Sequence, residues 1–160
     1  MIFADISCSA SSGSILNYTT TPTSYTQQLY NYTATFNGTA ILEFGFHVQN
    51  SVKSWYIDDV SIVDVAISNV SMLVNGDFEV GNLTGWTVTC ISENCGGTGG
   101  ALVTSSCYAG SYCYIDTCSG GYDFLRQSFN VTVRHVYLLS FWIKTVSNPN
   151  NRAYVNIYQA

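Results

Sequence analysis

The sequence predicts an all-β protein built as an antiparallel β-sandwich. Apolar and polar residues alternate with a period of two along many segments, which is typical of strands with one buried face. Tyr, Val, Ile and Phe occur beside abundant Ser, Thr and Asn, a composition that favours strands. No segment has a convincing 3.6-residue period, so we expect little helix. Many short strands separated by turn residues indicate a sandwich.

The first third of the chain is predicted to form a strand and a hairpin. Residues 3–8 alternate like a strand, and a polar loop follows as far as Pro22. Residues 25–36 and 40–48 alternate again, and Asn37-Gly38 between them can form a two-residue turn. We therefore expect these two segments to pair as a β-hairpin.

The rest of the chain is predicted to supply most of the strands. These strands are residues 55–65, 67–74, 86–91, 112–117, 123–131, 136–145 and 152–159. Trp86 is expected in the core rather than on a ligand-binding surface. Residues 95–100, which read CGGTGG, are too rich in glycine to pack as a strand. We expect a loop there that disulfides hold in place.

Composition limits the possible functions. The length of 160 residues suits a single domain with a real core. Hydrophobic residues make up 47% of the chain, yet no apolar run approaches the roughly 20 residues that span a bilayer. The net charge of −5 and the five Lys and Arg argue against a nucleic-acid partner, which needs clustered cations.

Cysteines and glycosylation sequons favour secretion. Five of the six cysteines are crowded into residues 90–118, without a CxxC pair or a nearby histidine, so disulfides are favoured over a metal cluster. Either Cys8 completes the set or its partner lies outside this sequence. The disulfide candidates are Cys8, Cys90, Cys95, Cys107, Cys113 and Cys118. The candidate N-glycosylation sites are Asn17, Asn31, Asn37, Asn69, Asn82 and Asn130.

Two acidic clusters lie at predicted strand ends. Asp58 and Asp59 form the first cluster, and Asp77 and Glu79 form the second. Like charges this close repel each other unless a cation or hydrogen-bond donors neutralise the repulsion. Hard oxygen ligands in loops suit Ca²⁺. The alternative is two unrelated acidic turns, and spacing alone does not separate the two interpretations.

Two motifs carry a resemblance to a known family. Residues 55–62 read WYIDDVSI, and residues 73–86 read LVNGDFEVGNLTGW. They resemble the carbohydrate-binding modules with a galactose-binding-like jelly roll, which open with a strand like LVNGDFE followed by GW and close with one like YIDDVS. The resemblance implies structural calcium, with ligands from Glu79, the Asp77 backbone and one of Asp58 or Asp59.

The two motifs stand in reversed order, with the closing motif first. The simplest interpretation is a chain that starts inside one module, crosses a boundary near residues 64–71, and stops inside the next copy of a tandem array. Residues 1–65 are then the C-terminal half of one module and residues 66–160 the N-terminal part of the next. The similar segments 3–6 and 154–157 support this interpretation. The two halves are complementary, so they could also close as one circularly permuted sandwich.

Outward-facing strand residues could bind a neutral oligosaccharide or polysaccharide. Sugar binding needs aromatic faces and polar groups on a rigid surface. If their strands are sheet neighbours, one cleft would gather Trp142, Lys144, Tyr154, Asn156, Tyr158, Glu43 and His47. Each could equally be an ordinary exposed or half-buried strand residue.

We expect no enzyme activity, because no GxSxG motif occurs and the acids cluster where the resembled family places calcium. The first function hypothesis is therefore a secreted, non-catalytic carbohydrate-binding module beside neighbouring modules. The alternative is a structural or adhesive extracellular spacer that has lost sugar binding. An accessory module of a glycoside hydrolase is compatible with either hypothesis.

Overall fold

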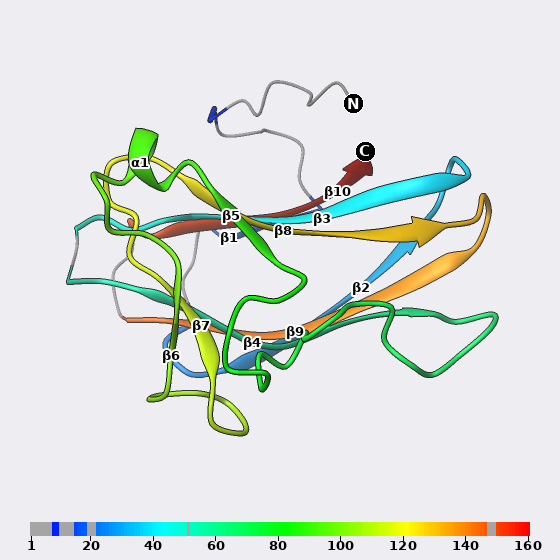
Figure 1. The fold of residues 1–160 in the computed structure, drawn as a ribbon, viewed down its shortest axis with the longest axis horizontal. Coiled ribbons are helices and arrows are strands. Elements are labelled where there is room, and N and C mark those ends of the chain that lie inside the picture. The colour runs from blue at the N-terminus through cyan, green and yellow to red at the C-terminus, as the bar shows by residue number, and fades with distance from the viewer. Residues whose placement is uncertain (1–7, 10–14, 19–21, 51, 147–149) are drawn as a thin grey trace.

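The structure is a computed structural model that describes residues 8–9, 15–18, 22–50, 52–146 and 150–160. These residues form two five-stranded antiparallel sheets stacked face to face, as Figure 1 shows. The one helix in the described part of the chain is the single turn α1 (Ile91–Asn94). The predicted all-β sandwich is thus confirmed. The predicted strand at residues 3–8 and the repeat of segment 3–6 lie outside the described residues, apart from Cys8.

Each sheet has a defined strand order. Sheet A contains, side by side, β1 (Leu16–Tyr18), β10 (Arg152–Gln159), β3 (Gly38–His47), β8 (Asp123–Val131) and β5 (Thr87–Thr89). Sheet B contains β2 (Thr26–Thr33), β9 (Val136–Thr145), β4 (Trp55–Asp64), β7 (Cys113–Asp116) and β6 (Ala101–Val103). Both sheets draw strands from residues before and after position 65, so the two halves of the chain interleave.

Consecutive strands of the chain alternate between the sheets, and in the described residues only β6 and β7 pair directly. The predicted hairpin of residues 25–36 and 40–48 is therefore wrong. β2 pairs with β9, whereas β3 pairs with β8 and β10. Asn37-Gly38 does reverse the chain, but it carries the backbone across the sandwich.

The connection between β8 and β9 crosses the sandwich beside it. The Ala34 N–H donates to the His135 carbonyl at 3.0 Å, and the Val133 N–H donates to Asn37 Oδ1 at 2.9 Å. These bonds satisfy backbone groups that a hairpin would have paired differently.

Residues 67–74 form turns and bends, not the predicted strand. This segment covers the edge of β4: the Met72 N–H donates to the Ile62 carbonyl at 2.7 Å, and the Val60 N–H donates to the Gly76 carbonyl at 2.9 Å. A side chain at Gly76 would collide with the Val60 carbonyl, so only glycine allows this approach. The apolar run that suggested a strand instead lies irregularly along a sheet edge.

The core lies between the two sheets. Phe44 of sheet A and Phe141 of sheet B meet edge to face, with ring centroids 5.1 Å apart. Trp86 is 6% exposed and stacks on the fully buried Phe78, so its predicted place in the core is confirmed. Strands β8, β9 and β10 begin and end where the period of two predicted them.

Candidate binding surfaces

The predicted ligand-binding residues lie on two opposite faces of the sandwich. Trp142 and Lys144 are on the outer face of sheet B, since their neighbours on β9 fill the core. The other five residues belong to β3 and β10 in sheet A. The condition for one shared cleft was that these strands be sheet neighbours; β3 and β10 are neighbours, but β9 lies in the other sheet. The predicted single cleft is therefore corrected to two separate surfaces.

On sheet A, the carboxylate of Glu43 is the centre of a hydrogen-bonded network. It accepts from Arg126 Nε at 2.7 Å, from the Tyr158 hydroxyl at 3.0 Å and from the Tyr154 hydroxyl at 3.2 Å. Glu43 and Tyr154 are both only 3% exposed. Burial, followed by the nearby Glu43 charge, raises the pKa of Tyr158. Because the Glu43 oxygens already accept these three donors, the buried network stabilises the fold and has little capacity left to bind sugar hydroxyls.

The remaining sheet A candidates are also occupied by neighbours. Tyr154 lies beneath Tyr122 and Phe124, so its ring is not an open platform. His47 Nδ1 lies 2.8 Å from the Gly121 carbonyl oxygen, and its ring packs on Tyr122. Asn156 is half-buried on β10. Among the described residues of this face, the predicted ligand-binding side chains therefore form no stack of exposed rings.

On the outer face of sheet B, four aromatic rings and one ammonium group lie close together. We call this group the aromatic surface; it consists of Tyr25, Tyr56, Tyr108, Trp142 and Lys144. Trp142 and Tyr108 stack with ring centroids 3.8 Å apart and planes 14° apart. Lys144 Nζ lies 4.5 Å from the Tyr25 ring centroid and 4.9 Å from that of Tyr56. Tyr108 is the most open ring, at 41% exposed.

The environment of the aromatic surface shifts two pKa values. Burial lowers the pKa of Lys144, because the charged ammonium loses part of its hydration. Burial raises the pKa of Tyr25, and the nearby Asp58 charge raises it further. Sequence reasoning missed Tyr25, Tyr56 and Tyr108. Tyr56 could have been found, because it alternates with buried Trp55 and Ile57, but the fold alone brings in Tyr108.

Asp58 lies behind the aromatic surface and is 1% exposed. Its Oδ2 accepts the Tyr108 and Ala109 N–H groups at 2.9 and 3.0 Å, and its Oδ1 accepts the Asp59 N–H at 2.8 Å. Burial raises the pKa of Asp58, and these backbone donors oppose the rise. Asp59 is exposed and has a φ of +52°, at an irregularity where β4 carries an extra residue against β9.

Glu79 reaches the same loop as Asp58. Its two carboxylate oxygens accept the Ser111 N–H at 2.9 and 3.0 Å, and Oε1 also accepts the Tyr112 N–H at 2.9 Å. Asp77 Oδ1 accepts the Glu79 N–H at 3.2 Å and so closes a local turn. Backbone N–H groups thus donate hydrogen bonds to the carboxylates of both Glu79 and Asp77.

The carboxylates of the four predicted calcium ligands do not form one close cluster. No three of Asp58, Asp59, Asp77 and Glu79, all of which the structure describes, bring carboxylate oxygens within 4.8 Å of one another. Two of these carboxylates, those of Asp58 and Glu79, already accept hydrogen bonds from backbone N–H groups. Calcium binding by these acids remains a prediction that this arrangement does not favour.

All six cysteines form disulfides, and Cys8 does complete the set. The bonds are Cys8–Cys90, Cys95–Cys118 and Cys107–Cys113. Cys95–Cys118 holds the glycine-rich loop, as predicted. Three disulfides indicate an oxidising compartment such as the extracellular space.

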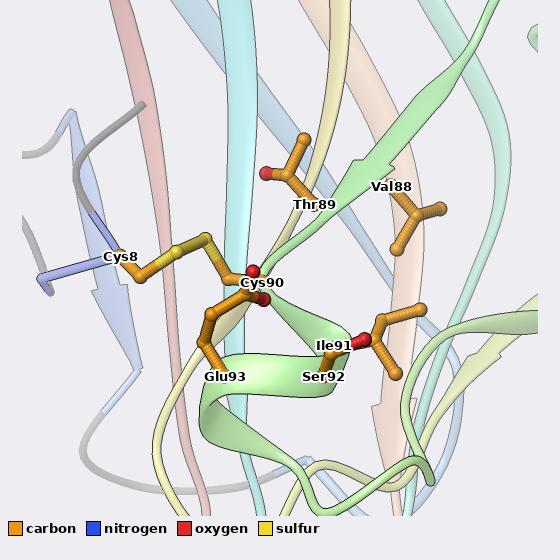
Figure 2. Close-up of a pocket in the computed structure, with 7 residues that line it drawn as sticks. All are labelled: Cys8, Val88, Thr89, Cys90, Ile91, Ser92 and Glu93. Carbon is orange, nitrogen blue, oxygen red and sulfur yellow. A yellow bond between two sulfur atoms is a disulfide. The ribbon is translucent and has the colours of Figure 1, made fainter. Parts of the chain in front are cut away.

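A hollow adjoins the Cys8–Cys90 disulfide, as Figure 2 shows. It lies where β5 leads into α1, and Thr89 and Glu93 provide polar groups on its wall. None of the predicted ligand-binding residues lines it, and we assign it no ligand.

The sequon asparagines are all exposed. Asn17 and Asn130 lie on sheet A, and Asn31 lies on sheet B. Asn37, Asn69 and Asn82 lie in connections. Every predicted glycosylation site could therefore carry a glycan without unfolding the domain.

Among the described residues, no helix has the length and apolar character needed to cross a membrane. Comparisons with protein-family models, curated protein sequences and solved structures found no match to this chain.

Proposed function

We propose that this domain is a non-catalytic carbohydrate-binding module of an extracellular protein and binds a neutral glycan on the aromatic surface of sheet B. The observation that carries the proposal is the stacked pair of Trp142 and Tyr108 beside the Lys144 ammonium. The motif resemblance to galactose-binding-like modules supports the same function.

The chemistry of the aromatic surface suits sugars. Pyranose rings present C–H faces that pack on aromatic rings, and their hydroxyls need fixed donors and acceptors. Lys144 offers N–H donors, and the exposed Gln27 lies opposite Trp142 in the β2–β9 register. Gln27 Nε2 donates to the Ser140 hydroxyl at 3.2 Å, which orients the amide beside the rings. The surface therefore combines flat apolar area with oriented polar groups.

Rigidity supports weak but specific binding. Tyr108 belongs to the loop closed by Cys107–Cys113, and Asp58 binds its backbone N–H. A ring held in place before binding loses little conformational entropy when the sugar arrives. We expect affinities in the micromolar to millimolar range, roughly −8 to −4 kcal/mol.

The experiment is a glycan array followed by calorimetry with the best neutral oligosaccharide. Trp142→Ala and Tyr108→Ala should each weaken binding at least about tenfold, or about 1.4 kcal/mol. The matched control is Tyr158→Phe, on the opposite face, which should bind like the unmodified protein. A folded protein that binds no glycan, or equal affinity in all three variants, would refute the proposal.

The alternative is a structural or adhesive spacer, and one observation favours it. Exposed sequons occur on both sheets and in the connections, so glycans could solubilise the whole domain. In that case the Trp142 and Tyr108 variants are silent in every ligand screen. Changing the number of such domains in the full-length chain alters reach or adhesion instead.

A further inference from the structure

Two aspartates face each other inside the sandwich, at the end that holds β6, β7 and the disulfide Cys95–Cys118. Asp116 on β7 pairs in register with core-facing Trp55, so it points inward from sheet B. Asp123 on β8 pairs with core-facing Phe46, so it points inward from sheet A. Both are 0% exposed. Two acids from different sheets thus meet in the interior.

Their carboxylate oxygens are only half satisfied. Asp116 Oδ1 accepts the Cys118 N–H at 2.9 Å, and Asp123 Oδ2 accepts the Gly100 N–H at 2.8 Å. Asp116 Oδ2 and Asp123 Oδ1 are buried without a hydrogen-bond partner. Buried polar atoms nearly always have partners, so two unpaired oxygens in one place need an explanation.

A third unpaired oxygen comes from Tyr114. Its side chain is 0% exposed and its hydroxyl has no hydrogen-bond partner. The hydroxyl lies against Gly100, where an added Cβ would collide with it, and Gly100 is also the residue that donates to Asp123. The tyrosine hydroxyl and the aspartate carboxylate therefore converge on the same backbone position.

No basic side chain neutralises the pair. The ion pairs found among the described residues join Arg126 to Glu43 and His135 to Asp64, and neither involves Asp116 or Asp123. Burying two unneutralised carboxylates beside each other is strongly unfavourable, so the pair needs either a cation or a proton.

We propose that Asp116, Asp123 and the Tyr114 hydroxyl supply three of the oxygen ligands of a binding site for a hard divalent cation such as Ca²⁺. All the available donors are oxygens, which hard cations prefer. The two disulfide sulfurs within 4.8 Å of the Asp123 carboxylate are already bonded to each other, so a thiolate metal such as Zn²⁺ gains no ligand from them.

This site differs from the calcium site predicted from sequence, because it uses none of Asp58, Asp59, Asp77 and Glu79. It also gives a role to the glycine-rich segment. At Gly99, as at Gly100, an added Cβ would collide with this cluster, here with the Asp123 carboxylate. The segment thus lies against the cluster, and its residues 96–98 are exposed.

The competing explanation is a shared proton. Burial, followed by a hydrogen bond between the two carboxyl groups and by the charge of Asp123, raises the pKa of Asp116 well above its ordinary value, which favours the protonated form in the absence of an ion. The two explanations differ in a measurable way, because only a cation site makes stability depend on calcium concentration at fixed pH.

The test uses the full chain with its disulfides intact. After EDTA treatment, adding Ca²⁺ at fixed pH should raise the melting temperature. Tb³⁺ should bind and give luminescence on excitation of tyrosine, because Tyr114 adjoins the site. Asp116→Asn and Tyr114→Phe should each weaken Tb³⁺ and Ca²⁺ binding more than tenfold. The exposed Asp77→Asn is the control and should bind like the unmodified protein.

Three results would overturn the proposal. One is a melting temperature that ignores both EDTA and Ca²⁺ in the unmodified protein. Another is a calcium response that survives in Asp116→Asn but is lost in Asp77→Asn or Glu79→Gln. The third is a melting temperature of Asp116→Asn that exceeds that of the unmodified protein whether or not Ca²⁺ is present. This result would indicate the shared proton. The unmodified protein alone decides the first outcome, so a variant that does not fold leaves the test intact.

Discussion

Asp58 and Glu79 bind the two halves of one loop. Asp58 accepts the N–H groups of residues 108 and 109, and Glu79 accepts those of residues 111 and 112, within the loop closed by Cys107–Cys113. The two acidic motifs are more than 20 positions apart in the sequence, yet they act on the same disulfide-closed loop. Through that loop they hold Tyr108 against Trp142.

Glu79→Ala should loosen this loop. The variant loses charge-assisted hydrogen bonds to two backbone N–H groups, and since Glu79 is exposed we expect a loss of about 1 kcal/mol in the free energy of unfolding. Urea unfolding measures it. Glu93→Ala, another exposed acid, is the control and should change the free energy by less than about 0.5 kcal/mol. Equal effects in both variants would contradict this role of Glu79.

The three disulfides should differ in their contributions to stability. Cys8 and Cys90 have a sequence separation of 82, whereas Cys107 and Cys113 have a separation of 6. In the chain-entropy description, closing the longer loop contributes about 4.5 kcal/mol and the shorter loop about 2 kcal/mol. Denaturant unfolding of the two double-serine variants compares them. If the short-loop variant is the less stable of the two, local contacts of the loop outweigh chain entropy.

Acid should weaken the contact between Asp64 and His135. Asp64 Oδ2 lies 2.7 Å from His135 Nδ1, and this hydrogen bond lowers the pKa of Asp64. A lowered pKa stabilises the fold above the ordinary Asp pKa of about 3.9, and this contribution is lost as pH falls through the lowered value. The unfolding midpoint is measured from pH 5 to pH 2. In His135→Ala it should fall less steeply with falling pH than in the unmodified protein. Asp64→Asn, which also removes the titrating acceptor of the Ala66 N–H, should flatten this pH dependence at least as much, and an unchanged pH dependence in both variants would disprove the assignment.

Gly45→Ala should destabilise sheet A, because an added Cβ would collide with the ring of Tyr154 on the neighbouring strand. We expect a loss of about 1–3 kcal/mol by thermal or urea unfolding. The same change made in a Tyr154→Ala background should cost much less, since the ring is then absent. Additive losses in the double variant would place the strain elsewhere.

Strand positions in the second half of the chain could be predicted from the sequence, but strand partners could not. β8, β9 and β10 follow from alternation alone, because each has one face in the core. Asn37-Gly38 indicates a chain reversal without saying whether the next strand pairs beside the last one or crosses to the other sheet. Local turn chemistry is the same in both cases, and only the distant partners, β9 for β2 and β8 for β3, decide between them.

For the candidate sites, the sequence likewise predicted side-chain directions but not neighbouring residues. Outward directions were predicted correctly for Trp142 and Lys144, because alternation fixes the face of a strand. Tyr154 also faces outward from sheet A, but Tyr122 and Phe124 cover it, and a single-strand pattern cannot reveal such a cover. No sequence pattern indicated that Asp116 and Asp123 lie together, because their proximity depends on how the two sheets stack.

The alternation of consecutive strands between sheets has a consequence for biogenesis. β3 acquires one of its two neighbours only from β10, so sheet A stays open until residues 152–159 have left the ribosome. Nearly every pairing is distant in the chain, and such topologies fold slowly. The nascent polypeptide must therefore stay unaggregated, with unpaired strand edges, until β10 is available to pair with β3.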